Sequence, residues 1–151
     1  MITRGITKLD YDEIVQVMDQ WWGGPAGTKA LPIFFYEFGS YALIAEEDQK
    51  MIGFLLGFMT DRQPRIGYVH LVGIHPQFRL RGVARALYDE FERRAHSHGA
   101  SRLKCITTQG NEGSVHFHEA MGYRAEFVPD YAGPGRDRVV FTKELGPARS
   151  N

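Results

Sequence analysis

Residues 68–88 read YVHLVGIHPQFRLRGVARALY, and this stretch decides the fold. Residues 69–74 form a short apolar, partly β-branched run, which predicts a strand that ends at His75-Pro76. A helix is predicted next, because apolar residues recur every four positions on one face: Val83, Leu87, Phe91 and Ala95. The segment 79–84 is therefore a tight basic turn between a strand and a helix.

A turn of this kind is suited to bind an anion. The first N–H groups of a helix lack intrahelical partners, and the helix dipole adds partial positive charge at the same end. Gly82 lets the backbone approach a ligand closely, and Ala84 keeps the next turn small. The guanidinium groups of Arg79, Arg81 and Arg85 suit phosphate oxygens. The turn therefore predicts a phosphate or pyrophosphate ligand.

Two common nucleotide-binding motifs are excluded at this turn. A P-loop requires Gly-Lys followed by Ser or Thr, and no such tripeptide occurs in the chain. A dinucleotide fingerprint requires three glycines spaced as G-x-G-x-x-G, whereas the turn contains one. The pattern that fits is Arg79-x-x-Gly82-x-Ala84. It resembles the acyl-CoA pyrophosphate loop of the GCN5-related N-acetyltransferase (GNAT) family.

Two further stretches carry the same resemblance. Residues 72–76, VGIHP, are similar to the family's fourth strand and its exit. Downstream, Asn111 precedes residues 117–123, FHEAMGY, which resemble the family's short helix ending in an aromatic-x-x-x-x-Gly-aromatic pattern. Because these motifs occur in the family's order, the chain is identified as a member of the GNAT family, with sharp matches in these regions only.

The composition sets the broad class. With 151 residues, 43% hydrophobic and 24% charged, the chain suits one soluble globular domain, expected at 1–146 with a tail at 147–151. The net charge of +0 and the lack of a basic helix face disfavour nucleic acid as a partner. No apolar run suits a membrane span or a signal peptide, and the single cysteine, Cys105, permits no internal disulfide. We therefore expect a cytoplasmic protein.

Hydrophobic periodicity and turn signals predict the remaining elements. The expected strands are 3–7, 41–46, 51–59, 68–74, 102–107, 125–128 and 138–143. The expected helices are one capped by Asp10 and Glu13 that ends at Gly23-Gly24-Pro25, and three more at 31–38, 83–98 and 112–121. A crossover helix between 68–74 and 102–107 implies parallel pairing of these two strands. The expected fold is a single α/β (α+β) domain with a mixed sheet of six or seven strands and helices on both faces.

The resemblance implies acetyl-CoA as the co-substrate and implies where it binds. In GNAT proteins the strands that match 68–74 and 102–107 splay apart, and the pantetheine arm lies between them. Carried over to this chain, the backbone of the first strand polarises the thioester carbonyl, and the basic turn holds the pyrophosphate. The implied cofactor-binding residues are Val72, Gly73, Ile74, Arg79, Leu80, Arg81, Gly82, Val83, Ala84, Arg85, Asn111 and Phe117.

The same resemblance implies positions for proton transfer. The chemistry requires no nucleophile on the protein, because an amine can attack a bound thioester directly in a ternary complex. His118 stands where many family members have a tyrosine that protonates the leaving thiolate. Tyr68 and His70 stand near the family's carboxylate base, and an imidazole titrates near neutral pH. Both histidines are equally consistent with structural roles, through packing or hydrogen bonding.

The acceptor site is expected beside the first two helices, as in the resembling family. The expected substrate-binding residues are Trp22, Phe35 and Tyr131, whereas Trp21 is expected in the core. No metal site is expected, because the neighbouring His96 and His98 lack a further set of ligands.

Two functions remain open at this point. The first is an N-acetyltransferase that moves an acetyl group to a primary amine of a small molecule, amino acid or peptide. The second is a catalytically silent acyl-CoA-binding module that senses or scaffolds, because the acid and base positions differ from the family's. An amine acceptor is the expected partner, without nucleic acid or membrane, and the protein is expected to be a monomer or homodimer.

Overall fold

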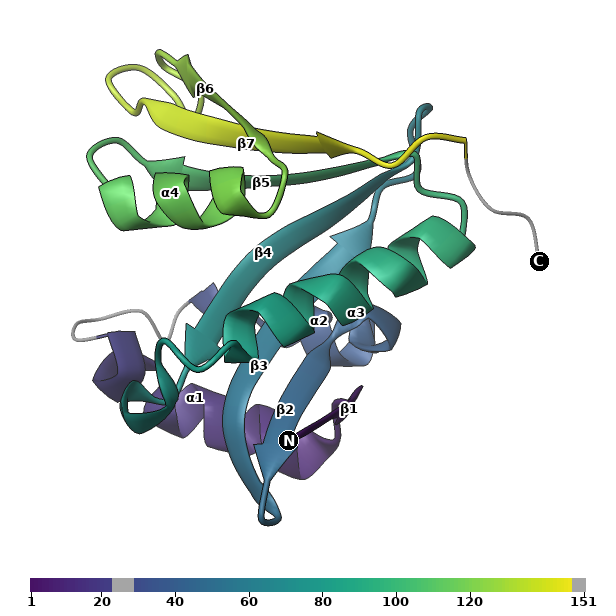
Figure 1. Ribbon diagram of the computed structural model, residues 1–151, viewed down its shortest axis with the longest axis vertical. Helices are drawn as coiled ribbons and strands as arrows, with labels where there is room; N and C mark the ends of the chain where they lie inside the picture. Colours follow the sequence, from purple (N-terminus) through teal and green to yellow (C-terminus); the bar gives the residue numbers. More distant parts are fainter. Residues whose placement is uncertain (23–28, 148–151) are drawn as a thin grey trace.

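Figure 1 shows the computed structural model, which describes residues 1–22 and 29–147. Its strands are β1 (Ile2–Gly5), β2 (Leu43–Glu47), β3 (Lys50–Met59), β4 (Ile66–Ile74), β5 (Arg102–Thr108), β6 (Arg124–Val128) and β7 (Arg138–Glu144). Its helices are α1 (Lys8–Trp22), α2 (Ile33–Tyr36), α3 (Val83–Ser97) and α4 (Glu112–Ala120), with 3₁₀ turns η2 (Gly39–Tyr41) and η3 (Pro76–Phe78). The expected helix end at Gly23-Gly24-Pro25 and tail residues 148–151 lie outside the described residues.

The strands form one seven-stranded mixed sheet in the order β1-β2-β3-β4-β5-β7-β6. Only β4 and β5 are parallel, as the crossover helix predicted. These two strands pair only where Ile66–Tyr68 meets Arg102–Lys104, although both continue further. Figure 1 shows them diverging from this junction. The mixed sheet with a splayed parallel pair is therefore confirmed, and the edge of β4 beyond Tyr68 is left without β5 as a partner.

Helices cover both faces of the sheet, as predicted (Figure 1). On one face, Leu87, Phe91 and Ala95 of α3 are fully buried in a core that includes Leu103 of β5. On the other face, residues of α1 and α2 pack in a second core around Phe54 of β3. Within the described part of the chain, no helix is both long and apolar enough to cross a membrane.

A β-bulge in β4 brings His70 to the face covered by α1 and α2. Leu56 of β3 pairs with Leu71, whereas the next residue of β3, Gly57, pairs with Val69. His70 is therefore an extra residue in β4, and the usual alternation of side chains is interrupted there. As a result, Val69 belongs to the core under α3 and Leu71 to the core under α1.

The start of α1 differs from the sequence-based prediction. Thr7 Oγ1 accepts the Asp10 N–H at 3.3 Å, and the Asp10 carboxylate accepts the Thr7 N–H at 2.7 Å. This reciprocal pair is a capping box with Thr7 as the N-cap, so the prediction of Asp10 and Glu13 as caps is wrong. The carboxylate of Asp10 is instead held in place by Arg4 at 2.6 Å.

The predicted helix over 31–38 is also shorter in the structure. Only Ile33–Tyr36 is α-helical, with Pro32 as its N-cap residue, and the 3₁₀ turn η2 follows. A segment of this length cannot be stabilised by its own hydrogen bonds. It is held by tertiary packing, because Phe34 is buried against the sheet.

Candidate acyl-CoA site and acceptor site

The turn before α3 has the backbone geometry of an anion site. Leu80 and Gly82 have φ angles of 61° and 81°, so the chain passes twice through the left-handed region before the helix begins. Glycine adopts this angle without strain, and the space beside its α-carbon is open. The first bond of the helix joins the Ala86 N–H to the Gly82 carbonyl at 3.1 Å. The N–H groups of residues 83–85 therefore lack intrahelical partners and are free to bind a ligand.

The three arginines of the turn are held in different ways. Arg79 donates a hydrogen bond to the Trp21 carbonyl at the end of α1, which favours positive charge there. The guanidinium of Arg81 lies over the ring of Phe78, 4.9 Å from its centroid. Arg85 lines the larger of two cavities that border the turn. Arg79 and Arg81 are thus anchored to neighbouring elements, while the backbone supplies the directed hydrogen-bond donors.

Two adjoining cavities follow the gap between β4 and β5. The larger, of about 970 Å³, extends from the basic turn along Ile74 and Val72. The smaller, of about 290 Å³, continues along β4 to Val69 and His70. The two share a set of lining residues: Trp22, Val72, Ala84, Asn111, Ser114 and Phe117. They therefore form one continuous cleft from the helix start to the bulge in β4.

Two residues of β4 line this cleft. Val72 lines both cavities and Ile74 the larger one. Gly73 lines neither, and a Cβ added to it would lie 2.4 Å from the ring of Phe54, in the core under α1. Packing therefore requires glycine at this position.

Asn111 and Phe117 lie on the opposite wall, at α4. Asn111 is the N-cap of α4, as predicted: its side-chain oxygen accepts the Ser114 N–H at 3.3 Å. Its amide also donates to Thr107 Oγ1 at 3.1 Å, which ties the start of α4 to β5. The Phe117 ring contacts Tyr88 of α3, with the ring centroids 5.4 Å apart. The structure thus brings both residues to the cleft that the basic turn opens.

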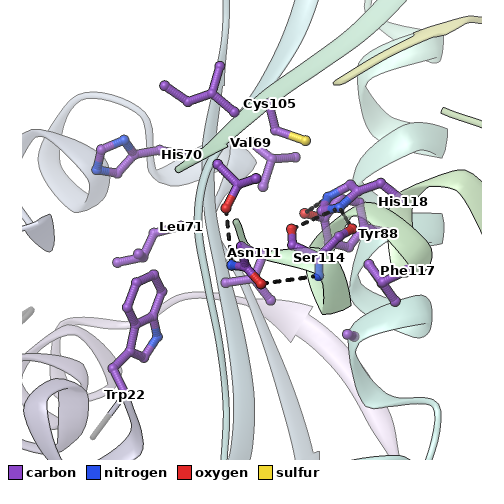
Figure 2. A pocket seen from close by; sticks show the side chains of 14 residues that line it. Trp22, Val69, His70, Leu71, Tyr88, Cys105, Asn111, Ser114, Phe117 and His118 are labelled. Carbon is purple, nitrogen blue, oxygen red and sulfur yellow. Dashed lines mark hydrogen bonds between the residues drawn. The ribbon is translucent and has the colours of Figure 1, made fainter. Parts of the chain in front are cut away.

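His118 lies deep in the same wall, and both of its ring nitrogens have partners. Nδ1 lies 2.7 Å from the Ser114 carbonyl, which can only accept, so Nδ1 carries the proton. Nε2 then accepts a hydrogen bond from the Tyr88 hydroxyl at 2.9 Å. The imidazole stacks on Phe141 at 4.1 Å, and burial lowers its pKa below the usual value. Figure 2 shows His118, Tyr88 and Ser114 gathered on one side of the pocket.

His70 has a different environment, on the opposite side of the pocket (Figure 2). Its Nε2 donates to the Lys29 carbonyl at 2.9 Å, and its ring stacks on Phe34 with the centroids 4.2 Å apart. Desolvation lowers its pKa, so the imidazole is neutral at pH 7. Because Nε2 carries the proton, Nδ1 is left as a lone-pair nitrogen without a hydrogen-bond partner among the described residues. An imidazole in this state can accept a proton.

Tyr68 lies on the same face as His70, but it is held in an aromatic cluster. Its ring stacks on Phe58 at 5.1 Å, and Phe58 in turn packs beside Phe34 at 6.3 Å. Desolvation raises the pKa of Tyr68 to about 12, so the hydroxyl is protonated at neutral pH. Tyr68 can therefore donate a hydrogen bond, but it is a poor candidate for a base.

Of the three residues expected at the acceptor site, only Trp22 lines the two cavities described above. Trp22 lines both cavities and is half-exposed, with the ammonium of Lys29 5.0 Å from its ring centroid. Tyr131 lies over β5, where the Lys104 ammonium is 5.2 Å from its ring centroid. Phe35 lines neither cavity and packs against Tyr11 of α1 at 5.9 Å.

The partners of the two histidines were not predicted from the sequence. Phe34, expected like most phenylalanines in the core, is buried there and is the ring that contacts His70. Tyr88 was not distinguished from the other core positions of α3, although a hydroxyl among the apolar residues Leu87, Phe91 and Ala95 was an available signal. Trp21, in contrast, is buried and stacks on Phe54 as expected for a core residue.

Comparison with known proteins agrees with this geometry. The profile of the acetyltransferase (GNAT) family matches residues 11–123. The chain belongs to the GNAT family. A curated relative, acetyltransferase plu1384 of Photorhabdus laumondii subsp. laumondii, is 25% identical over 103 residues, which cover 68% of this chain and 64% of that protein. The match thus spans about two-thirds of each protein's length.

Solved structures share the fold of this GNAT domain. A chain of the NatC complex bound to Gag peptide and CoA has a TM-score of 0.81 at 15% identity, with 95% of this chain and 98% of that chain covered. An aminoglycoside 6′-N-acetyltransferase complexed with coenzyme A has a TM-score of 0.77 at 14% identity, with 99% of both chains covered. At these identities the likeness establishes the fold and leaves the acceptor open.

The cleft and the side chains around it indicate which kinds of cofactor could bind. The free N–H groups at the start of α3, the open backbone edge of β4 and the connecting cleft fit a long ligand with a phosphate group at one end. Within residues 1–22 and 29–147 there is no group of three or more His, Cys, Asp or Glu side chains that could hold a metal ion. Cys105 is buried, and desolvation raises the pKa of its thiol to about 12, so it is unreactive at neutral pH.

Proposed function

We propose that the protein is an acetyl-CoA-dependent N-acetyltransferase that acetylates a primary amine in a ternary complex. The observation that carries this proposal is the continuous cleft, which joins the anion-binding turn of α3 to the neutral imidazole of His70. Acetyl-CoA supplies an activated acyl group as a thioester. The N–H groups of residues 83–85 would hold its pyrophosphate, and the β4 backbone at Val72 and Ile74 would bind and orient the pantetheine arm.

His70 is the proposed proton acceptor. An alkyl amine has a pKa of about 10 and arrives charged, so it must lose a proton before it can attack. The Nδ1 lone pair of His70 would accept this proton, directly or through water. The Lys29 carbonyl and the Phe34 ring fix the orientation of the imidazole. The lowered pKa of His70 keeps it in the basic form at neutral pH.

The proposed proton donor is the pair formed by Tyr88 and His118. In the tautomer that the Ser114 carbonyl requires, His118 has no free N–H for the departing sulfur. Tyr88 lines the same cavity, and burial raises the pKa of its hydroxyl well above the usual value, so the hydroxyl is protonated throughout the useful pH range. The single O–H of Tyr88 is held by His118 Nε2 in the free protein, so it would turn from Nε2 to the sulfur as it donates, and the phenolate would then regain a proton from water.

One of the two GNAT structures described above holds a peptide and the other is named for aminoglycosides, and this chain resembles both in fold, with TM-scores of 0.81 and 0.77. The function is therefore tested with purified protein, acetyl-CoA and a panel of small-molecule, amino-acid and peptide amines, by following thiol release and the acetylated product. Acetyl transfer to any amine, lost in a variant that cannot bind acetyl-CoA, supports the enzyme. Tight acetyl-CoA binding without transfer to any amine would instead support a silent sensor or scaffold.

A further inference from the structure

Two lysines lie next to residues that line the cleft: Lys29 contacts Trp22 and His70, and Lys104 directly precedes Cys105. None of the described residues that line the two cavities is an aspartate or glutamate. The ammonium of Lys29 lies over Trp22 at one side of the opening. A cationic acceptor would thus meet positive charge without a neutralising partner.

Lys104 is placed to meet an acceptor at the other side. On β5, Leu103 and Cys105 are buried under α3, so strand alternation points Lys104 to the opposite face, the face of His70. Lys104 pairs in register with Tyr68, the last paired residue before the strands diverge. His70 follows two residues later along β4, which corresponds to roughly 7 Å of strand. An acceptor with a few bonds between its anionic group and its amine could therefore reach the Lys104 ammonium and His70 at the same time.

Lys104 has no ion-pair partner in the described parts of the chain, and its ammonium rests over Tyr131. The nearby acidic residue Glu144 is already held by Arg102 at 2.6 Å. Across the strands, Lys104 pairs with Thr142 and Thr142 with Arg124, while Ile106 pairs with Val140 and Val140 with Glu126. Arg124 and Glu126 thus both lie on this face of β6, two strands away from β5, and their opposite charges offset each other, which leaves Lys104, of these three, as the charge nearest to β4.

We infer that the acceptor is an amine that also carries a carboxylate, and that Lys104 binds this carboxylate while the amine reaches His70. The inference rests on the proposed N-acetyltransferase function and specifies its acceptor. An anionic group would neutralise the lysines and orient the amine by a charge-assisted hydrogen bond. The positive charge left on the amine is disfavoured beside Lys29 and Lys104, which lowers its pKa and favours the attacking form. Amino acids and acidic peptides share this chemistry.

The test uses pairs of amines in which a carboxylate is replaced by a carboxamide, with kcat/KM expressed per unprotonated amine because the replacement also lowers the pKa of the amine. In the small-molecule arm, glycine, β-alanine and 4-aminobutyrate are compared with their carboxamides. In the peptide arm, peptides with Glu at the second position are compared with the same peptides carrying Gln. We expect the carboxylate member of the best pair to have a kcat/KM about 5- to 20-fold higher at low salt, with the difference decreasing as salt is added. The arm with the larger ratio distinguishes an amino acid from a peptide.

Variants connect this preference to Lys104. Lys104→Met should reduce the ratio to about one, Lys104→Arg should retain part of it, and Lys104→Glu should reverse it in favour of the amide. Lys50→Met, which removes a lysine from the distant β2–β3 hairpin, should leave the ratio unchanged. Equal or better turnover of the amides, or a ratio that survives Lys104→Met, overturns the inference while the enzyme assignment stands. Absence of transfer to every amine, with acetyl-CoA still bound, overturns the proposed function and the inference with it.

Discussion

The two ends of the cleft between β4 and β5 are built from different parts of the chain. At the proposed phosphate end, the candidate binding groups are the backbone N–H groups of residues 83–85, set by Gly82 and the start of α3. At the proposed acceptor end, the candidate groups are side chains from α1, β4, β5 and the β6–β7 connection. One added Cβ can abolish binding at a site made of backbone N–H groups from one short segment. At a site made of separate side chains, each substitution removes only part of the binding or catalytic free energy. The predictions below test this difference.

The largest effect is expected at Gly82. Gly82→Glu places a side chain and a negative charge beside the phosphate position and forces a φ of 81° on a residue with a Cβ. We expect the affinity for acetyl-CoA, measured by calorimetry, to fall by a factor on the order of 100 or more. Gly146→Glu is the matched control, because Gly146 also has positive φ and open surroundings but lies at the end of the chain. Unchanged affinity in folded Gly82→Glu protein contradicts the assignment of this turn.

A smaller effect is expected at the acceptor end, from His70. His70→Gln keeps a neutral side chain that can donate to the Lys29 carbonyl but removes the basic nitrogen. We expect kcat to fall roughly 100-fold at pH 7, at the lower end for general base catalysis, with the affinity for acetyl-CoA unchanged. The wild-type rate should also decline as the pH falls through the lowered pKa of His70, an inflection that the variant lacks. His116→Gln, on the exposed side of α4, is the control.

The Tyr88–His118 pair should give a still smaller kinetic effect, because a thiolate leaves with little assistance. We expect Tyr88→Phe and His118→Ala each to lower kcat about tenfold with little change in acetyl-CoA affinity, and His118→Tyr to restore part of the loss. Tyr88→Phe also leaves the buried Nε2 of His118 unpaired, which should reduce the free energy of unfolding by about 1–3 kcal/mol.

Tyr123→Phe is a matched control for this pair. The Tyr123 hydroxyl is buried and has no hydrogen-bond partner among the described residues, so its removal should leave stability equal or higher. Chemical denaturation measures the stability of each variant. Wild-type kcat and an unshifted pH–rate profile in both Tyr88→Phe and His118→Ala would show that the pair has a structural role only.

The smallest effect is the pH dependence of stability from His118. Its pKa in the folded protein is below the value of about 6.5 expected for the unfolded chain. Between these two values the unfolded chain binds a proton that the folded protein does not, so the free energy of unfolding falls as the pH drops below about 6.5. We expect a slope of at most ~1.4 kcal/mol per pH unit from this residue, reduced in His118→Gln and retained in His116→Gln. The carboxylate of Asp10, whose pKa is also lowered, acts in a separate window below about pH 4.

The sequence by itself determined the family, the fold and the local conformation of the turn before α3, the proposed phosphate end of the cleft. Gly82 in a basic turn, Asn111 as a helix cap and the four-residue repeat of α3 each act through their own segment of backbone. Local conformation depends mainly on neighbouring residues, so these features could be predicted in the right order and at the right positions. The parallel pairing of β4 and β5 followed from the crossover connection, and their splay was implied by the family resemblance.

Only the tertiary structure decided what surrounds the two histidines. The bulge at His70 depends on the register between β3 and β4, and the ring that contacts it proved to be Phe34 and not the neighbouring Phe35. The partner of His118 Nε2 is the hydroxyl of Tyr88, a residue 30 positions away on another helix. Both environments are set by contacts between distant segments, and burial and pKa are properties of those contacts. A one-residue change in register or helix phase alters them while the local sequence pattern stays the same, which is why the acceptor end could not be predicted.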